Sequence, residues 1–131
     1  MRFLLDTSVW LWSVGKVDRL NREAQSVLIS PENDLYFSAA SVWEIAIKVS
    51  IGRLQLLESI HTLIPRETAR LNLRPLAVSY IHAMAVYDLP IHHGDPFDRL
   101  LVAQARTEGL TIITSDREIQ SYSVPFLWAG Q

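Results

Sequence analysis

The chain has 131 residues, 49% of them hydrophobic and 20% charged, which is typical of a globular protein and predicts one domain over residues 1–131. It contains no cysteine, no apolar run long enough to span a bilayer and no pattern of a secretory signal, so we expect a cytoplasmic protein without disulfides or membrane spans. Its net charge of −2 argues weakly against a nucleic-acid partner, although a total charge hides how the charges are distributed.

The first half of the chain alternates short apolar runs, which predict buried strands, with segments whose apolar residues recur at helical spacing. The first of these helical segments is apolar on every side, so we expect it to be buried against the sheet or a partner and to end near Gly15. Strands are expected at residues 2–5 and 35–38, helices at 9–14, 20–28 and 41–50, and a turn at 30–34.

The second half is less regular, because prolines interrupt its patterns. A helix over 58–70 has to kink or split at Pro65, and a strand over 71–76 is weakened by Pro75. The other elements are expected as helices at 79–87, 96–107 and 117–122, strands at 110–114 and 124–128, and a polar loop at 88–94. Alternation of this kind predicts an α/β/α sandwich with a mainly parallel central sheet of about five strands.

Four acidic residues lie near the starts of predicted helices that follow or feed these strands: Asp6, Glu44, Asp98 and Asp116. Each of them has a capping explanation when taken alone. Ser41 and Glu44 have the spacing of a capping box, and Asp95 with Asp98 has nearly the same form. Taken together, however, they are expected to meet at the carboxyl edge of the parallel strands, where open α/β sheets place their sites.

Four carboxylates in one place repel one another unless a cation neutralises them, and oxygen ligands suit Mg²⁺ or Mn²⁺. A site of this kind supports hydrolysis of a phosphodiester by activated water, without a serine, cysteine or histidine nucleophile. Setting these four aside from the 14 acidic residues leaves ten against 12 basic ones. The rest of the protein is therefore slightly basic, which allows a substrate with a phosphate backbone.

The segments around the four acids resemble those of PIN-domain ribonucleases, and most closely the VapC-type toxins of bacterial and archaeal toxin–antitoxin pairs. The resemblance covers nearly the whole chain, and its segments are Leu4 to Ser8, Ser41 to Ile45, Asp95 to Ala105 and Ile113 to Asp116. It implies a PIN-like fold and a metal-dependent endoribonuclease that acts on RNA, is held by an antitoxin protein and forms a homodimer. It also implies roles for the acidic quartet, Asp6, Glu44, Asp98 and Asp116, as catalytic residues and metal ligands, and for Thr7, Ser8 and Ser115 beside the metal.

Several other polar residues have two interpretations each. His92 and His93 lie in the predicted polar loop. They are interpreted either as solvated side chains or as residues that contact a phosphate or a metal. Lys48 follows Glu44 by one helical turn. It is interpreted either as the partner of Glu44 in an ion pair or as a cation near the scissile phosphate. Arg99 and Arg117 each follow a quartet acid directly. They are interpreted either as surface residues or as phosphate ligands.

Other classes of protein also use acidic sites. A phosphoacceptor receiver domain needs paired acids after the first strand and a lysine after a late one, whereas Asp6 stands alone and Ser115 occupies the late position. A phosphatase of the haloacid-dehalogenase type needs a second aspartate where this chain has Ser8. A binding module with an inactive acid cluster is a third alternative, and the complete quartet favours a nuclease over it.

Overall fold

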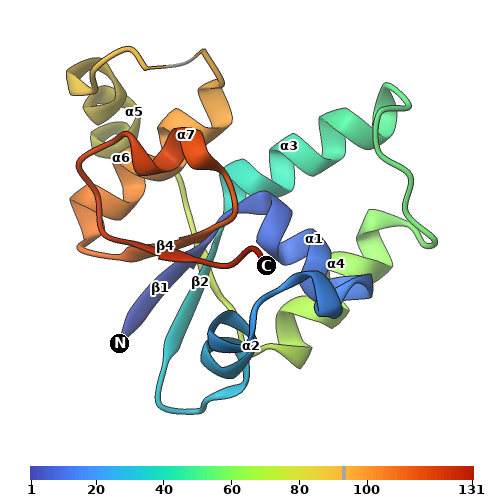
Figure 1. The fold of residues 1–131 in the computed structure, drawn as a ribbon. Coiled ribbons are helices and arrows are strands. Elements are labelled where there is room, and N and C mark those ends of the chain that lie inside the picture. Colours follow the sequence, from blue (N-terminus) through green and yellow to red (C-terminus); the bar gives the residue numbers. More distant parts are fainter. Residues whose placement is uncertain (93) are drawn as a thin grey trace.

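The computed structural model describes residues 1–92 and 94–131, which fold around a parallel five-stranded sheet of order β3-β2-β1-β4-β5 (Figure 1). Every neighbouring pair of these strands is parallel. The strands are β1 (Arg2–Leu5), β2 (Asp34–Ser38), β3 (Arg74–Leu76), β4 (Thr111–Thr114) and β5 (Phe126–Trp128). The predicted parallel α/β architecture is thus confirmed, with β3 and β5 shorter than expected.

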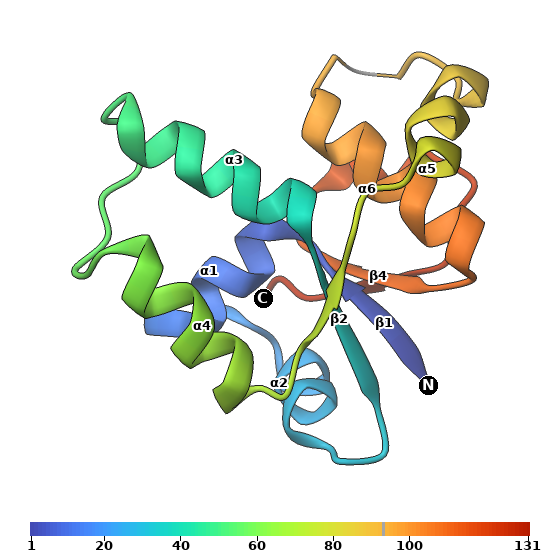
Figure 2. The same ribbon diagram turned by 180° about the vertical axis from the view of Figure 1, so that it is seen from behind.

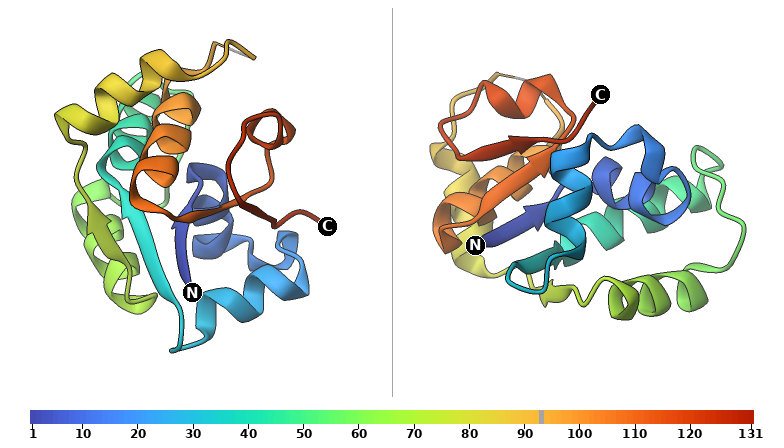
Figure 3. Two further views of the ribbon diagram at one scale, coloured as in Figure 1. Left: turned by 90° about the vertical axis from the view of Figure 1, so that its left-hand side faces the viewer. Right: turned by 60° about the horizontal axis from the view of Figure 1, so that its bottom comes forward.

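Helices cover both faces of this sheet, as Figure 2 and the left view of Figure 3 show. The helices are α1 (Thr7–Gly15), α2 (Arg22–Ile29), α3 (Ala39–Ser50), α4 (Ile60–Arg70), α5 (Tyr80–Ala85), α6 (Pro96–Glu108) and α7 (Arg117–Gln120), with 3₁₀ turns at Val17–Arg19 and Val86–Asp88. Within the described residues, none of the helices is both long enough and apolar enough to cross a membrane.

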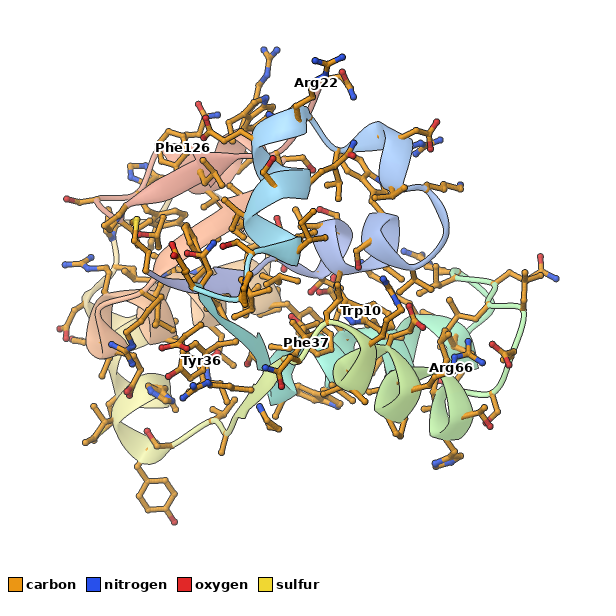
Figure 4. All side chains as sticks on the ribbon, turned by 90° about the horizontal axis from the view of Figure 1, so that it is seen from below. Trp10, Arg22, Tyr36, Phe37, Arg66 and Phe126 are labelled. Atoms are coloured by element: carbon orange, nitrogen blue, oxygen red, sulfur yellow. The ribbon has the colours of Figure 1, made fainter. Side chains whose placement is uncertain are left out.

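Alternate residues of the central strands point into two separate cores. Phe3 and Leu5 of β1 pack with α1, α2 and α4, whereas Leu4 between them packs with α6. Trp10 of α1 stacks on Phe37 of β2, with ring centroids 5.1 Å apart (Figure 4). A strand that is buried on both faces needs an apolar residue at every position, which explains the continuous apolar runs of the sequence.

The strand order reverses between β1 and β4. The chain builds outward from β1 through β2 to β3, and then crosses to the other side to add β4 and β5. In open α/β sheets, a reversal of this kind opens a crevice at the carboxyl ends of the two central strands. Asp6 directly follows β1 and Asp116 lies two residues after β4, so both lie at this position.

One local prediction was wrong, and another is narrowed to one of its two alternatives. The capping box of Ser41 and Glu44 does not form, because α3 begins one turn earlier, with Ser38 as the N-cap whose side chain accepts a hydrogen bond from the Ala40 amide. The helix expected to kink or split at Pro65 does not split there, since α4 continues from Ile60 to Arg70.

Candidate active site

Asp6 is held in place by the strand that it follows and by its neighbour β4. Its amide donates to the carbonyl of Ile113 at 3.0 Å, which extends the pairing of β1 with β4 by one residue. Its carboxylate is buried and accepts two hydrogen bonds, from the Ser8 amide at 3.1 Å and from the Thr114 hydroxyl at 2.6 Å. Asp6 is therefore the predicted N-cap of α1 and is also tied to the end of β4.

Asp116 is linked to Asp6 through the same threonine. Its amide donates to the Thr114 hydroxyl at 2.9 Å, and its carboxylate caps α7 by accepting from the Glu118 amide at 2.9 Å. The hydroxyl of Thr114 thus contacts two members of the quartet at once. The sequence did not reveal this residue, because it reads as the last residue of a strand and carries no motif of its own.

Glu44 lies in the second turn of α3 and is buried. Its Oε2 accepts from the ammonium of Lys48 at 2.6 Å, one helical turn further along. Its Oε1 is fully enclosed and has no hydrogen-bond partner among the described residues. A buried carboxylate oxygen without a partner is costly, so this atom suits a ligand that the protein itself does not supply.

Asp98 enters the site from the first turn of α6. Asp95 caps this helix by accepting from the amides of Phe97 at 2.9 Å and Asp98 at 3.1 Å, and Pro96 occupies the first helical position, as predicted. The Asp98 carboxyl is buried. The cap fixes the first turn of α6, and with it the direction from which Asp98 approaches the strands.

The four acids act on one another electrostatically. The pKa of Asp6 is raised from 3.8 to about 6, chiefly by burial and also by the charges of Asp116 and Glu44, while the hydrogen bonds from Thr114 and Ser8 oppose the rise. Burial raises the pKa of Asp98 well above its usual range, and the charge of Asp6 and a hydrogen bond with Asp116 add to it. The structure thus places the four predicted acids near enough to act on one another electrostatically.

These residues fit a divalent cation that prefers oxygen ligands. Three observations agree: the ligands offered are all carboxylates, two of them have raised pKa values, and Glu44 keeps a buried oxygen unpaired. In the described part of the chain, no three histidine, aspartate or glutamate side chains already converge as a metal site. Instead, Asp6 is hydrogen-bonded to Thr114 and Glu44 to Lys48.

The smaller polar residues of the site connect its elements. Ser8 and Ser115 lie with their hydroxyl oxygens 3.3 Å apart, joining α1 to the residue before Asp116. Thr7 donates to the Ser41 hydroxyl at 2.8 Å in a buried contact that holds the start of α1 against α3. Thr7 therefore stabilises the framework that carries Glu44.

The remaining candidates divide between structural and exposed positions. Arg99 donates to the carbonyls of Pro90 and Val86 and to the Tyr122 hydroxyl, so it serves the structure around α6. Arg117 is exposed. The ring of His92 packs edge-on against Tyr122, with centroids 4.9 Å apart, whereas His93 lies outside the described residues.

The fold and this site define the class of the protein, an α/β/α protein with an acidic centre at the point where the strand order reverses. The chain belongs to the PIN-domain family, whose model matches residues 3–125. It is also 31% identical over 123 residues to Ribonuclease VapC22 of Mycobacterium tuberculosis, a match that covers 93% of this chain and 92% of the relative. The predicted resemblance is thereby confirmed, and family membership argues against the receiver and phosphatase alternatives.

Solved structures share the fold at low sequence identity. The crystal structure of VapBC2 from Rickettsia felis, bound to a DNA fragment from its promoter, superposes with a TM-score of 0.74 at 15% identity and covers 98% of this chain and 99% of its own. DNA-bound VapBC from Salmonella typhimurium gives a TM-score of 0.69 at 16% identity, covering 97% of each chain. In both comparisons the shared fold extends over nearly the whole length of the two chains compared, which agrees with the family assignment.

Proposed function

We propose that the protein is an endoribonuclease that hydrolyses RNA phosphodiester bonds with the aid of Mg²⁺ or Mn²⁺, and that it is the toxin of a toxin–antitoxin pair. The coarser statement, a hydrolase of the nuclease class, follows from the PIN family and from the ribonuclease relative. The observation that carries the finer statement is the carboxylate quartet: Asp6, Glu44 and Asp98 are buried, two of the four have raised pKa values, and Glu44 has an oxygen without a partner among the described residues.

Each side chain of the quartet has a part in this mechanism. Asp6, Glu44, Asp98 and Asp116 would hold the cation. When present, the cation supplies a hydroxide nucleophile near neutral pH and offsets the negative charge that develops on the phosphate. Thr114 keeps Asp6 and Asp116 at a fixed separation by contacting both, and the Asp95 cap keeps Asp98 in place. Burial limits the screening of the charges of Asp6, Glu44 and Asp98 by bulk water.

The partners follow from the same proposal. A toxin–antitoxin complex from Klebsiella pneumoniae shares the fold, with a TM-score of 0.61 at 18% identity, and we propose a corresponding antitoxin for this chain. We also propose a homodimer and a cytoplasmic location, where RNA is available. Apolar surface for protein partners exists on α5, where Tyr80, Ile81, Met84 and the nearby Tyr87 are exposed. A separate apolar hollow lies between α1 and α4, and its lining includes Leu11, Trp12, Leu54, Leu56 and Leu63.

RNA cleavage in defined metal conditions tests the mechanism. The purified protein is incubated with structured RNA in Mg²⁺ or Mn²⁺, with excess chelator, and as the Asp6→Asn variant, which keeps the capping oxygen but loses the charge. We expect cleavage with the metal and at least about a hundredfold loss in both controls, since removal of a group that stabilises transition-state charge costs this much. Cleavage that persists with the chelator and in the variant would refute the proposal, and a protein that never cleaves would be an inactive binding module.

A further inference from the structure

Lys48 is a basic side chain that pairs with one member of the acidic quartet, Glu44. Its ammonium lies 2.6 Å from Oε2 of Glu44, and its side chain is 45% exposed where that of Glu44 is 6% exposed. The one other lysine of the chain, Lys16, is exposed beyond the far end of α1.

The two oxygens of Glu44 are in different situations. Oε2 is occupied by Lys48, and Oε1 is buried and unpaired among the described residues. A divalent cation that uses Glu44 would lie a few ångströms from the ammonium, in a buried region where like charges repel strongly. The cation and the Lys48 ammonium therefore compete for the same carboxylate.

The position of Lys48 allows it to leave Glu44 without any movement of α3. The pair is at i and i+4 on one helix, so the ammonium rests over the side chain of Glu44 only while its four-carbon stem folds back toward the start of the helix. The stem is flexible and half of the side chain already faces solvent. A rotation about side-chain bonds suffices to turn the ammonium outward.

We propose that Lys48 is an exchangeable counter-ion: it neutralises Glu44 while no divalent cation is bound, and it is released by the cation to bind a phosphate of the RNA. The inference rests on the proposed divalent-cation site. In this arrangement one side chain both limits repulsion in the metal-free site and adds a positive charge on the substrate side when the cation arrives. Glu44 is never left as an isolated buried charge.

Competition and a positioning role predict opposite changes in cation affinity when Lys48 is removed. If Lys48 merely held Glu44 in the correct rotamer, its removal would weaken binding of the cation. If Lys48 competes with the cation, its removal strengthens that binding, by up to about fivefold for a half-exposed ion pair. The direction of the change in Mg²⁺ affinity therefore separates the two roles without any measurement of catalysis.

Isothermal titration of the RNA-free protein with Mg²⁺ tests the competition. Lys48→Met keeps the apolar stem and removes the charge, and Lys16→Met makes the same change in net charge at the far end of α1. We expect tighter Mg²⁺ binding in Lys48→Met, wild-type affinity in Lys16→Met and intermediate or wild-type affinity in Lys48→Arg. Equal or weaker binding in Lys48→Met overturns the proposal, whereas a wild-type protein that binds no Mg²⁺ or Mn²⁺ refutes the proposed function instead.

The salt dependence of RNA cleavage tests the phosphate contact. At saturating Mg²⁺, we expect Lys48→Met to lower kcat/KM and to reduce the slope of its logarithm against the logarithm of salt concentration by about one, the loss of one phosphate contact. Lys48→Arg should restore the slope, and Lys16→Met should leave it unchanged. A slope in Lys48→Met equal to that of the wild type overturns the proposal, even if the protein folds normally by circular dichroism.

Discussion

At the scale of single residues, the site depends on a hydroxyl that the sequence pattern did not single out. Acids that follow buried strands could be predicted, because parallel strands deliver their carboxyl ends to one edge. Thr114 could not, since a threonine at the end of Thr111 to Thr114 is an ordinary strand residue. Its role arises only when β1 and β4 pair and Asp6 comes within 2.6 Å of it.

We predict that Thr114→Val impairs the site more than its small change in volume suggests. The variant leaves Asp6 Oδ2 and the Asp116 amide without their partner, at a cost of about 1–3 kcal/mol in the free energy of unfolding. Mg²⁺ binding should weaken with it. Urea unfolding and Mg²⁺ titration measure both, with Thr111→Val at the half-buried start of the same strand as the control. Equal behaviour of the two variants would contradict the assigned role.

At the scale of elements, the helices that carry Glu44 and Asp98 are joined behind the site. The Ser38 hydroxyl caps α3 by accepting from the Ala40 amide and donates to Oε1 of Gln104 on α6 at 2.6 Å. Gln104 is fully buried, and its amide nitrogen donates to the Ala77 carbonyl at 3.3 Å. The N-cap of one helix is thus fixed by a side chain of the other.

This link also explains why the start of α3 was predicted wrongly. Ser38 and Ser41 are both competent N-caps, and the spacing from Ser41 to Glu44 fits a capping box. Tertiary partners decide between them, because Gln104 satisfies the Ser38 hydroxyl and Thr7 satisfies that of Ser41. The start of α6 was predicted correctly, because Asp95 and Pro96 determine it locally.

We predict that Gln104→Met, a replacement of similar size, lowers the free energy of unfolding by about 1–3 kcal/mol, because the buried Ser38 hydroxyl and Ala77 carbonyl lose a partner. It should also weaken Mg²⁺ binding, since α3 and α6 are no longer held together at their polar contact. Chemical unfolding and Mg²⁺ titration check both effects, and Gln120→Met on the surface of α7 is the control. Normal Mg²⁺ affinity in a destabilised Gln104→Met would show that the link serves folding alone.

At the scale of the whole molecule, the fold stabilises a sheet at the expense of concentrating negative charge at one edge. The parallel topology was predictable from the alternation of strands and helices, and so was the gathering of the four acids. The distances within the site were not predictable, because they depend on individual side-chain contacts. Thr114 joins β4 to the residue after β1, and Lys48 folds back along α3 onto Glu44. In the metal-free protein, the negative charge of these four acids is not neutralised by a divalent cation.

That charge makes the metal-free protein less stable as the pH rises. An acid whose pKa is higher in the folded than in the unfolded protein contributes stability that is complete below the unfolded value and is lost as the pH rises through the folded value. For Asp6 these values are 3.8 and about 6, a loss of about 3 kcal/mol, and for Asp98 the loss continues to higher pH. With chelator present, the thermal midpoint should therefore fall between about pH 4 and pH 8.

The same reasoning predicts that Asp98→Asn stabilises the metal-free fold while it removes activity. The amide carries no charge to desolvate, so the variant should show a higher thermal midpoint at pH 8 in chelator and a flatter pH profile than the wild type. Mg²⁺ should raise the midpoint of the wild type at pH 8 and change the variant much less, because the variant lacks one ligand. Asp18→Asn, an exposed carboxyl, should follow the wild type throughout. A wild-type midpoint that is independent of both pH and Mg²⁺ would mean that the four charges are neutralised by the protein alone, and the need for a divalent cation would disappear.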